Sequence, residues 1–313
     1  MAALLLTIHC SAEDSVVVTG ARTPVDKSYR KMVRGMDLFE RMHAIAPLAA
    51  LRYRLVPRKS HTDLDGVAVS IVGDGFVLPV AMAPDRTFVL ARDRKAWSAD
   101  ALVRANRGAE SMTWRAEIRT PGLAAGTRRL GDLRLECLVG MEADLVSHYP
   151  SFIERVLSAL QDPKGFCGQR DVPYLFFADR PIFGVTLVAG ERRQALSVMQ
   201  LYAGLARGKT PQGDLKYCDC EALLDRAYYV PLGDTSWPDD TLVKLEPMDA
   251  PPARDALDET LAGGTKTDVS AAFGKPVALR FASGYEVWAY PGAAEVMVLF
   301  DPAGTVVKAR LNP

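Results

Sequence analysis

Residues 263–313 constrain the fold most, because there the pattern of the sequence resolves into a complete small fold. Thr265 and Asp268 place a hydroxyl three residues before a carboxylate, the spacing that caps the first backbone N–H groups of a helix. Apolar residues follow at helical spacing until Gly274 ends the helix and Pro276 prevents its continuation. The sequence therefore predicts a helix of about two turns.

Four runs rich in β-forming residues follow this helix, at 277–281, 285–290, 295–300 and 305–310. Turn sequences separate the runs, and the last of them, 301–304, has proline at its second position and glycine at its fourth. We expect an antiparallel meander of the last three runs, with the first run an irregular approach to it.

A series of short motifs runs through the same stretch. They are Gly264-Thr265, Val269, Phe273-Gly274-Lys275-Pro276, Trp288-Ala289-Tyr290, Leu299-Phe300 and Gly304-Thr305-Val306. In this order they resemble the SmpA/OmlA domain, over about a sixth of the chain. The resemblance implies a periplasmic, non-catalytic interaction module, as in the small lipoprotein of the outer-membrane assembly machine, with a related fold in β-lactamase-inhibitor proteins. The chain departs from the family in showing one helix before the sheet, although 253–261 could supply another.

Three aromatic residues of this module are the predicted partner-binding residues: Tyr285, Trp288 and Tyr290. On an open face or edge of the last sheet they would supply large, rigid contact groups. Tyr and Trp also fill sheet cores, which is the alternative for these positions. We therefore predict an envelope protein as partner, with peripheral association with the outer membrane.

The N-terminus indicates export. Residues 2–8 form a short apolar run, and residues 10–12 provide the small side chains of a cleavage site, so we predict a signal peptide over 1–12. The basic segment that normally precedes the apolar run of a signal peptide is missing. Its absence would be explained by a start codon placed too late, or by a buried N-terminal segment in place of a signal peptide. Ile8 and His9, which precede Cys10, do not provide the small residue that a lipoprotein signal needs before its cysteine. We expect a periplasmic or secreted protein.

The N-terminal part alternates apolar and polar residues between positions 51 and 123, with glycine, aspartate or proline between the runs. Such spacing is typical of short antiparallel strands in a sandwich. We predict an α+β fold with a β-sandwich-like domain over 13–125 and a disulfide-stapled α+β region over 126–247, followed by a linker and the SmpA/OmlA-like module over 248–313. Within the middle region we expect a helix at 151–160 and strands at 174–177, 183–188 and 196–202.

Four cysteines remain after removal of the signal peptide: Cys137, Cys167, Cys218 and Cys220. An even number in an exported chain predicts two disulfides. Since residues separated by one position form a strained ring, we expect Cys137 and Cys167 each to pair with one member of the Cys218/Cys220 pair. The alternative is a redox-active pair at Cys218 and Cys220. The spacing does not match a zinc site, so no metal is expected.

Catalytic motifs are missing from the sequence, and His43, His61 and His148 stand alone. Glu136, Glu142 and Asp144 have the spacing of an acid–base pair and equally of a solvated helix face. We predict no catalytic residue and no cofactor, with a periplasmic hydrolase whose site lies within 13–247 as the alternative.

The charge balance, 38 basic and 38 acidic residues, argues against a nucleic-acid partner. The longest apolar runs fall short of the roughly eighteen residues of a transmembrane helix.

Overall fold

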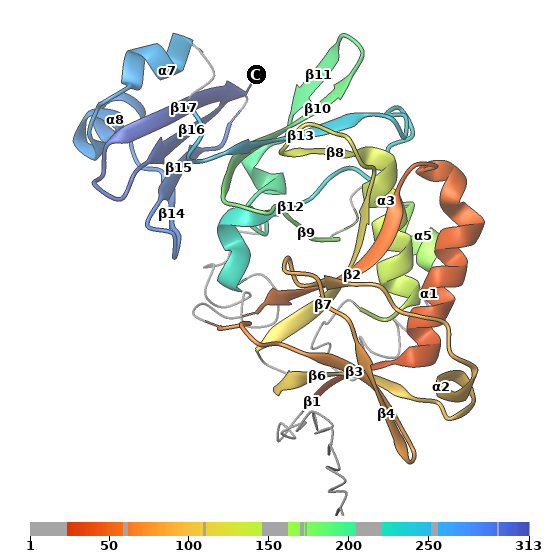
Figure 1. Cartoon of the computed structure of the whole chain (residues 1–313). Helices are drawn as coiled ribbons and strands as arrows, with labels where there is room; N and C mark the ends of the chain where they lie inside the picture. The colour runs from red at the N-terminus through yellow and green to blue at the C-terminus, as the bar shows by residue number, and fades with distance from the viewer. Residues whose placement is uncertain are drawn as a thin grey trace, which may run out of the picture.

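The computed structural model describes residues 24–58, 62–108, 111–145, 162–169, 172, 174–204, 221–251, 256–292 and 294–312. Within these ranges the protein is α+β, its strands pair antiparallel, and its C-terminal part is a meander covered by helices (Figure 1). The expected fold class is confirmed. The signal peptide predicted at 1–12 and the helix expected at 151–160 lie outside the described residues.

The N-terminal part contains two antiparallel sheets and two helices. In chain order the elements are β1 Pro24–Ser28, α1 Tyr29–Met42, β2 Ala50–Pro57, β3 Val69–Gly73, β4 Phe76–Val80, β5 Thr87–Phe88, α2 Arg94–Ser98, β6 Leu102–Gly108 and β7 Met112–Arg119. One sheet has the order β1-β6-β3-β4 and the other β5-β2-β7. The alternation predicted β6, where every second side chain is buried, as at Val103 and Ala105. On β7 both faces are buried from Met112 to Ala116.

The middle part adds a second group of short strands around a buried helix. Its elements are β8 Thr127–Arg129, α3 Leu130–Glu142, α5 Pro163–Cys167, β9 Phe176–Phe177, β10 Ile182–Ala189, β11 Arg192–Ala195, β12 Ala227–Tyr228 and β13 Leu242–Pro247. They form the sheets β11-β10-β13-β8 and β12-β9. Short 3₁₀ turns lie at Val198–Gln200 and Glu221–Arg226.

The strand expected at 196–202 is wrong. β11 ends at Ala195, and the chain then enters the 3₁₀ turn, where the Ser197 hydroxyl accepts from the N–H of Met199. The Glu295 carboxylate from the C-terminal sheet accepts from the Ser197 hydroxyl at 2.8 Å and from the N–H of Val198 at 2.9 Å. These tertiary bonds replace the strand pairing that the local sequence favours.

Helix α3 lies beside α1, and β7 and α5 are its other main neighbours (Figure 1). Most of its residues are buried on every side rather than along one stripe. Close packing against α1 depends on Gly35, where an added Cβ would stand 2.9 Å from the Cβ of Ala143. A helix buried all round shows no amphipathic pattern, so hydrophobic periodicity does not reveal it.

The C-terminal part consists of α7 Ala256–Leu261, α8 Lys266–Phe273, β14 Val277–Arg280, β15 Glu286–Tyr290, β16 Glu295–Phe300 and β17 Val306–Asn312. The predicted capping box is confirmed, with the Asp268 carboxylate accepting from the N–H of Thr265 at 2.8 Å. Gly274 ends α8 with φ of 79°. The first β run is a full strand that pairs with β15, so the meander has four strands rather than three. Helix α7 supplies the helix that the sequence placed near 253–261.

Both faces of this meander are covered. Trp288, Val298 and Phe300 pack toward α7 and α8 on one face. Val287 and Met297, on the other face, belong to the core cluster that extends through the middle and N-terminal parts. This continuous cluster packs the three parts of the chain together. The domain boundaries expected at 125/126 and 247/248 stay predictions.

Candidate functional site

The three predicted contact residues are not displayed on an open face. Trp288 is 9% exposed, donates to Glu286 at 2.6 Å and packs edge-on against Phe300. Tyr290 is half-buried, with its ring 5.4 Å from that of Phe273 on α8. Tyr285 packs against the main core. The open face expected for these residues is wrong because α7 and α8 cover one side of the sheet. A contact role for them stays a prediction.

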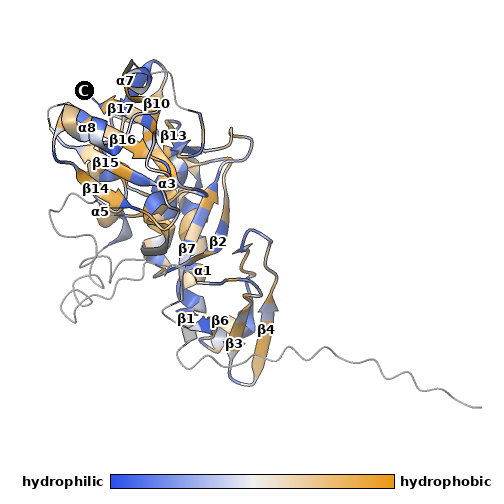
Figure 2. Cartoon of the chain, turned by 90° about the vertical axis from the view of Figure 1, so that its left-hand side faces the viewer, coloured by the Kyte–Doolittle hydropathy of each residue, from blue (hydrophilic) through white to orange (hydrophobic). Residues whose placement is uncertain are grey.

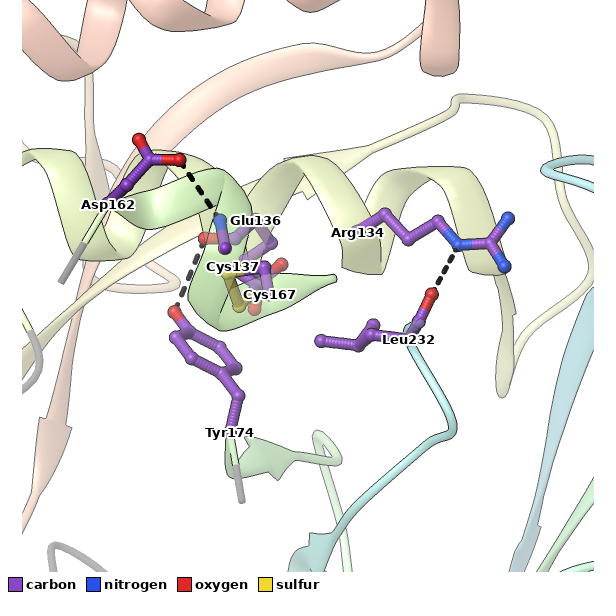
Figure 3. The surroundings of a disulfide bond; sticks show 8 residues. Arg134, Glu136, Cys137, Asp162, Cys167, Tyr174 and Leu232 are labelled. Carbon is purple, nitrogen blue, oxygen red and sulfur yellow. Dashed lines mark hydrogen bonds between the residues drawn. A yellow bond between two sulfur atoms is a disulfide. The ribbon is translucent and has the colours of Figure 1, made fainter. Parts of the chain in front are cut away.

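One disulfide joins α3 to α5 (Figure 3). Cys137 and Cys167 are both buried, their Cα atoms lie 6.1 Å apart, and their sulfurs are bonded at 2.00 Å. The pairing expected for these two cysteines with the Cys218/Cys220 pair is therefore wrong. Asp162 caps α5 by accepting from the N–H of Gly165, which sets this short helix against α3. Cys218 and Cys220 lie outside the described residues.

The carboxylates considered as an acid–base set do not converge. Glu142 and Asp144 form surface ion pairs with Arg34 and Lys31 on α1. Glu136 pairs with Arg128 and is 8% exposed, so the interpretation of this residue as part of a solvated face is wrong.

The described residues hold no group of three or more His, Cys, Asp or Glu placed to bind a metal ion. The Nε2 atom of His43 lies 3.0 Å from the carbonyl oxygen of Ala49, a structural contact. His61 and His148 lie outside the described residues.

Glu136 leads to a feature that the sequence did not reveal, a cavity of about 150 Å³ lined by charged side chains. These are Arg54, Arg86, Arg115, Arg119, Arg128, Arg226, Glu117, Glu136 and Asp179. Six guanidinium groups against three carboxylates leave a formal surplus of three positive charges. We call this feature the arginine cavity.

Two carboxylates hold the arginines at the outer side of the cavity. Asp179 accepts from both Nη atoms of Arg119, at 3.0 and 2.9 Å, and from Arg54 at 2.7 Å. Partial burial raises the pKa of the Asp179 carboxyl, but these bonds outweigh burial and lower the pKa to about 2. Glu117 lies 3.1 Å from Arg54 and 2.8 Å from the Nε atom of Arg119. Asp179 is therefore ionised throughout the physiological pH range.

The inner side of the arginine cavity contains a buried ion pair. The Nη2 atom of Arg128 donates to Glu136 and to the carbonyl oxygen of Ile118, both at 2.8 Å. Burial raises the pKa of the Glu136 carboxyl, and the charge of Arg128 opposes that shift. The Nε atom of Arg128 and the hydroxyl of Tyr228 are buried and have no hydrogen-bond partner within the described ranges. Burial raises the pKa of Tyr228 to about 12, so this hydroxyl stays protonated.

Strand β4 is a second feature with functional potential. It is an outer strand of its sheet, and its sequence, residues 76–80, consists of apolar residues and Pro79. Val77 is 52% exposed. The β3–β4 hairpin extends from one end of the molecule, and β4 is coloured as hydrophobic over most of its length (Figure 2).

Comparisons with known proteins assign no family. No family model matches the chain, and no curated protein or solved structure matches it. Among the described helices, none has the length and apolar character needed to cross a membrane.

Proposed function

We propose that this chain is an exported, non-catalytic protein of the cell envelope that binds a protein partner by strand addition to β4. The observation that carries the proposal is the apolar outer strand β4, on which Val77 is 52% exposed. An outer strand presents unpaired backbone N–H and C=O groups, and an extended segment of a partner can pair with them. Outer strands usually carry charged residues that prevent such pairing, and β4 carries none.

The occupant we propose is an extended segment with apolar side chains. Val77 and the half-buried Phe76 and Leu78 would supply the side-chain contacts. Backbone hydrogen bonds would set the register of the added strand. Pro79 offers no backbone donor, so we place the contact on residues 76–78.

The proposal of export rests on the buried Cys137–Cys167 disulfide, because such bonds persist in oxidising compartments. The apolar N-terminal run and the SmpA/OmlA-like pattern at 263–313 agree with it. The C-terminal sheet is covered on both faces. We therefore propose that it stabilises the middle part of the protein through contacts such as that of Glu295 with Ser197. In the described part of the chain, nothing favours a hydrolase or a thiol redox protein.

A photoreactive amino acid placed at position 77 in the native host tests the contact directly. We expect one discrete cross-linked adduct from position 77 and none from position 48, where Leu48 is also apolar and 67% exposed. Val77→Lys should weaken binding of the partner so identified by about tenfold or more, because a charge would enter an apolar contact. Equal adduct patterns from both positions, or none from position 77, would contradict the proposal.

A further inference from the structure

The residues that line the arginine cavity carry more positive than negative charge, and Asp225, which is not a lining residue, offsets part of the surplus through an ion pair with Arg226 at 3.9 Å. Its six guanidinium groups come from segments far apart in the chain, including β2, β7 and β8, and three carboxylates offset half of their charge. Like charges held this close repel one another, and the repulsion is strongest at the inner side, where Arg128 is buried. An anion in the cavity removes that cost.

The inner wall also has hydrogen-bond donors without acceptors. Arg128 is 5% exposed and lines the cavity, and its Nε–H has no acceptor within the described residues. Tyr228 is fully buried behind Phe176, a lining residue that is its cross-strand partner and whose ring lies 5.7 Å away. Buried donors are nearly always hydrogen-bonded to protein, water or ligand. An unsatisfied donor on the lining residue Arg128, with the Tyr228 hydroxyl unsatisfied behind the wall, indicates a missing acceptor.

We propose that the arginine cavity binds a small phosphate-bearing ligand, either inorganic phosphate or the phosphoryl group of a phosphomonoester. Guanidinium groups match the spacing of phosphate oxygens in paired hydrogen bonds. A phosphomonoester carries a charge of about −1.5 to −2 at neutral pH, which suits the surplus of positive charge that remains after the Asp225–Arg226 pair better than a single carboxylate does. A volume of about 150 Å³ suits a small ligand.

The Asp179 carboxylate, at the mouth of the cavity, would compete with a bound anion for the same arginines. Its carboxylate takes hydrogen bonds from Arg54 and Arg119, and its side chain is 54% exposed. The phosphoryl group would replace this carboxylate as acceptor for the two arginines. Asp179 stays ionised near neutrality, so a pH dependence of the competition in that range would come from the phosphate, whose second pKa is about 6.

Titration calorimetry of the full chain with inorganic phosphate tests the site. We expect saturable binding of one phosphate to the unmodified protein, and binding about five- to tenfold tighter to Asp179→Asn, because the competing charge is removed. Arg86→Gln, a change at an exposed lining arginine, should weaken binding about fivefold. The matched controls are Asp249→Asn and Arg180→Gln, which alter an exposed ion pair outside the cavity and should leave affinity unchanged.

Several results would overturn the assignment. Absence of saturable binding at millimolar phosphate, with both the unmodified protein and Asp179→Asn folded, removes the site. An equal change in phosphate affinity for Asp179→Asn and Asp249→Asn would show that both act through the net charge of the protein rather than through the cavity. Tighter binding of succinate than of phosphate rejects the phosphate class. Tighter binding of phenyl phosphate than of inorganic phosphate supports the site and identifies a monoester as its ligand.

Discussion

Replacing Arg128 with methionine is expected to lower the free energy of unfolding by about 3–5 kcal/mol. The substitution leaves the carboxylate of Glu136 buried without its partner and removes the donor to the carbonyl oxygen of Ile118. Urea unfolding followed by circular dichroism measures the change. The expected loss is large because the cost arises from an unpaired buried charge rather than from one lost surface contact.

The pH dependence of this variant provides a second readout. Burial raises the folded-state pKa of Glu136 above its ordinary value of 4.5, and the variant lacks the charge of Arg128 that opposes this shift. A raised carboxyl pKa means that the folded state binds the proton more tightly than the unfolded state. The variant should therefore regain part of its stability as the pH falls toward 4.5.

The matched control for this prediction is Arg180→Met. Arg180 forms an ion pair with Asp249 in which both side chains are more than half exposed, so the loss should stay below about 1 kcal/mol. The double change Arg128→Met with Glu136→Leu should cost less than Arg128→Met alone, because no charge is left unpaired. A loss under about 1 kcal/mol for Arg128→Met would contradict the buried ion pair.

Removing the Cys137–Cys167 disulfide is expected to lower the free energy of unfolding by about 3.5 kcal/mol in the chain-entropy description. The two cysteines are 30 positions apart, and the bond restricts the unfolded chain over that loop. We expect the loss in the double alanine variant, and in the unmodified protein on addition of dithiothreitol. Urea unfolding with and without the reductant measures both.

The double alanine variant serves as its own control, because its unfolding midpoint should not respond to dithiothreitol. An unmodified protein whose midpoint is equally insensitive would show that the disulfide is not formed or does not contribute. The argument for an oxidising compartment would fail if the disulfide were not formed.

The C-terminal part was predictable because its signals are local. The capping box at Thr265 and Asp268, the glycine at 274 and the turn at 301–304 act on neighbouring residues, and each is present in the structure. The first strand, β14, was underestimated because its exposed residues break the alternation on which strand prediction depends. What the local sequence could not show was that both faces of the sheet are covered, which buried Trp288.

The middle part was less predictable because tertiary contacts determine it. Helix α3 is buried on all sides, so its one long acidic side chain in the interior, Glu136, resembled a solvated residue in the sequence. The disulfide depends on the position of α5 against α3, which spacing along the chain does not encode.

The arginine cavity had no signal in the sequence, because residues as far apart as Arg54 and Arg226 line it. Only the packing of β2 and β7 against the later segments brings them together.

Non-reducing peptide mapping of protein recovered from fractionated cells of the native host tests export and the disulfide together. We expect a peptide containing Cys137 linked to one containing Cys167, in protein from the envelope or periplasmic fraction. Free thiols at both positions in protein from the cytoplasm, or Cys137 linked to Cys218 or Cys220, would contradict the assignment.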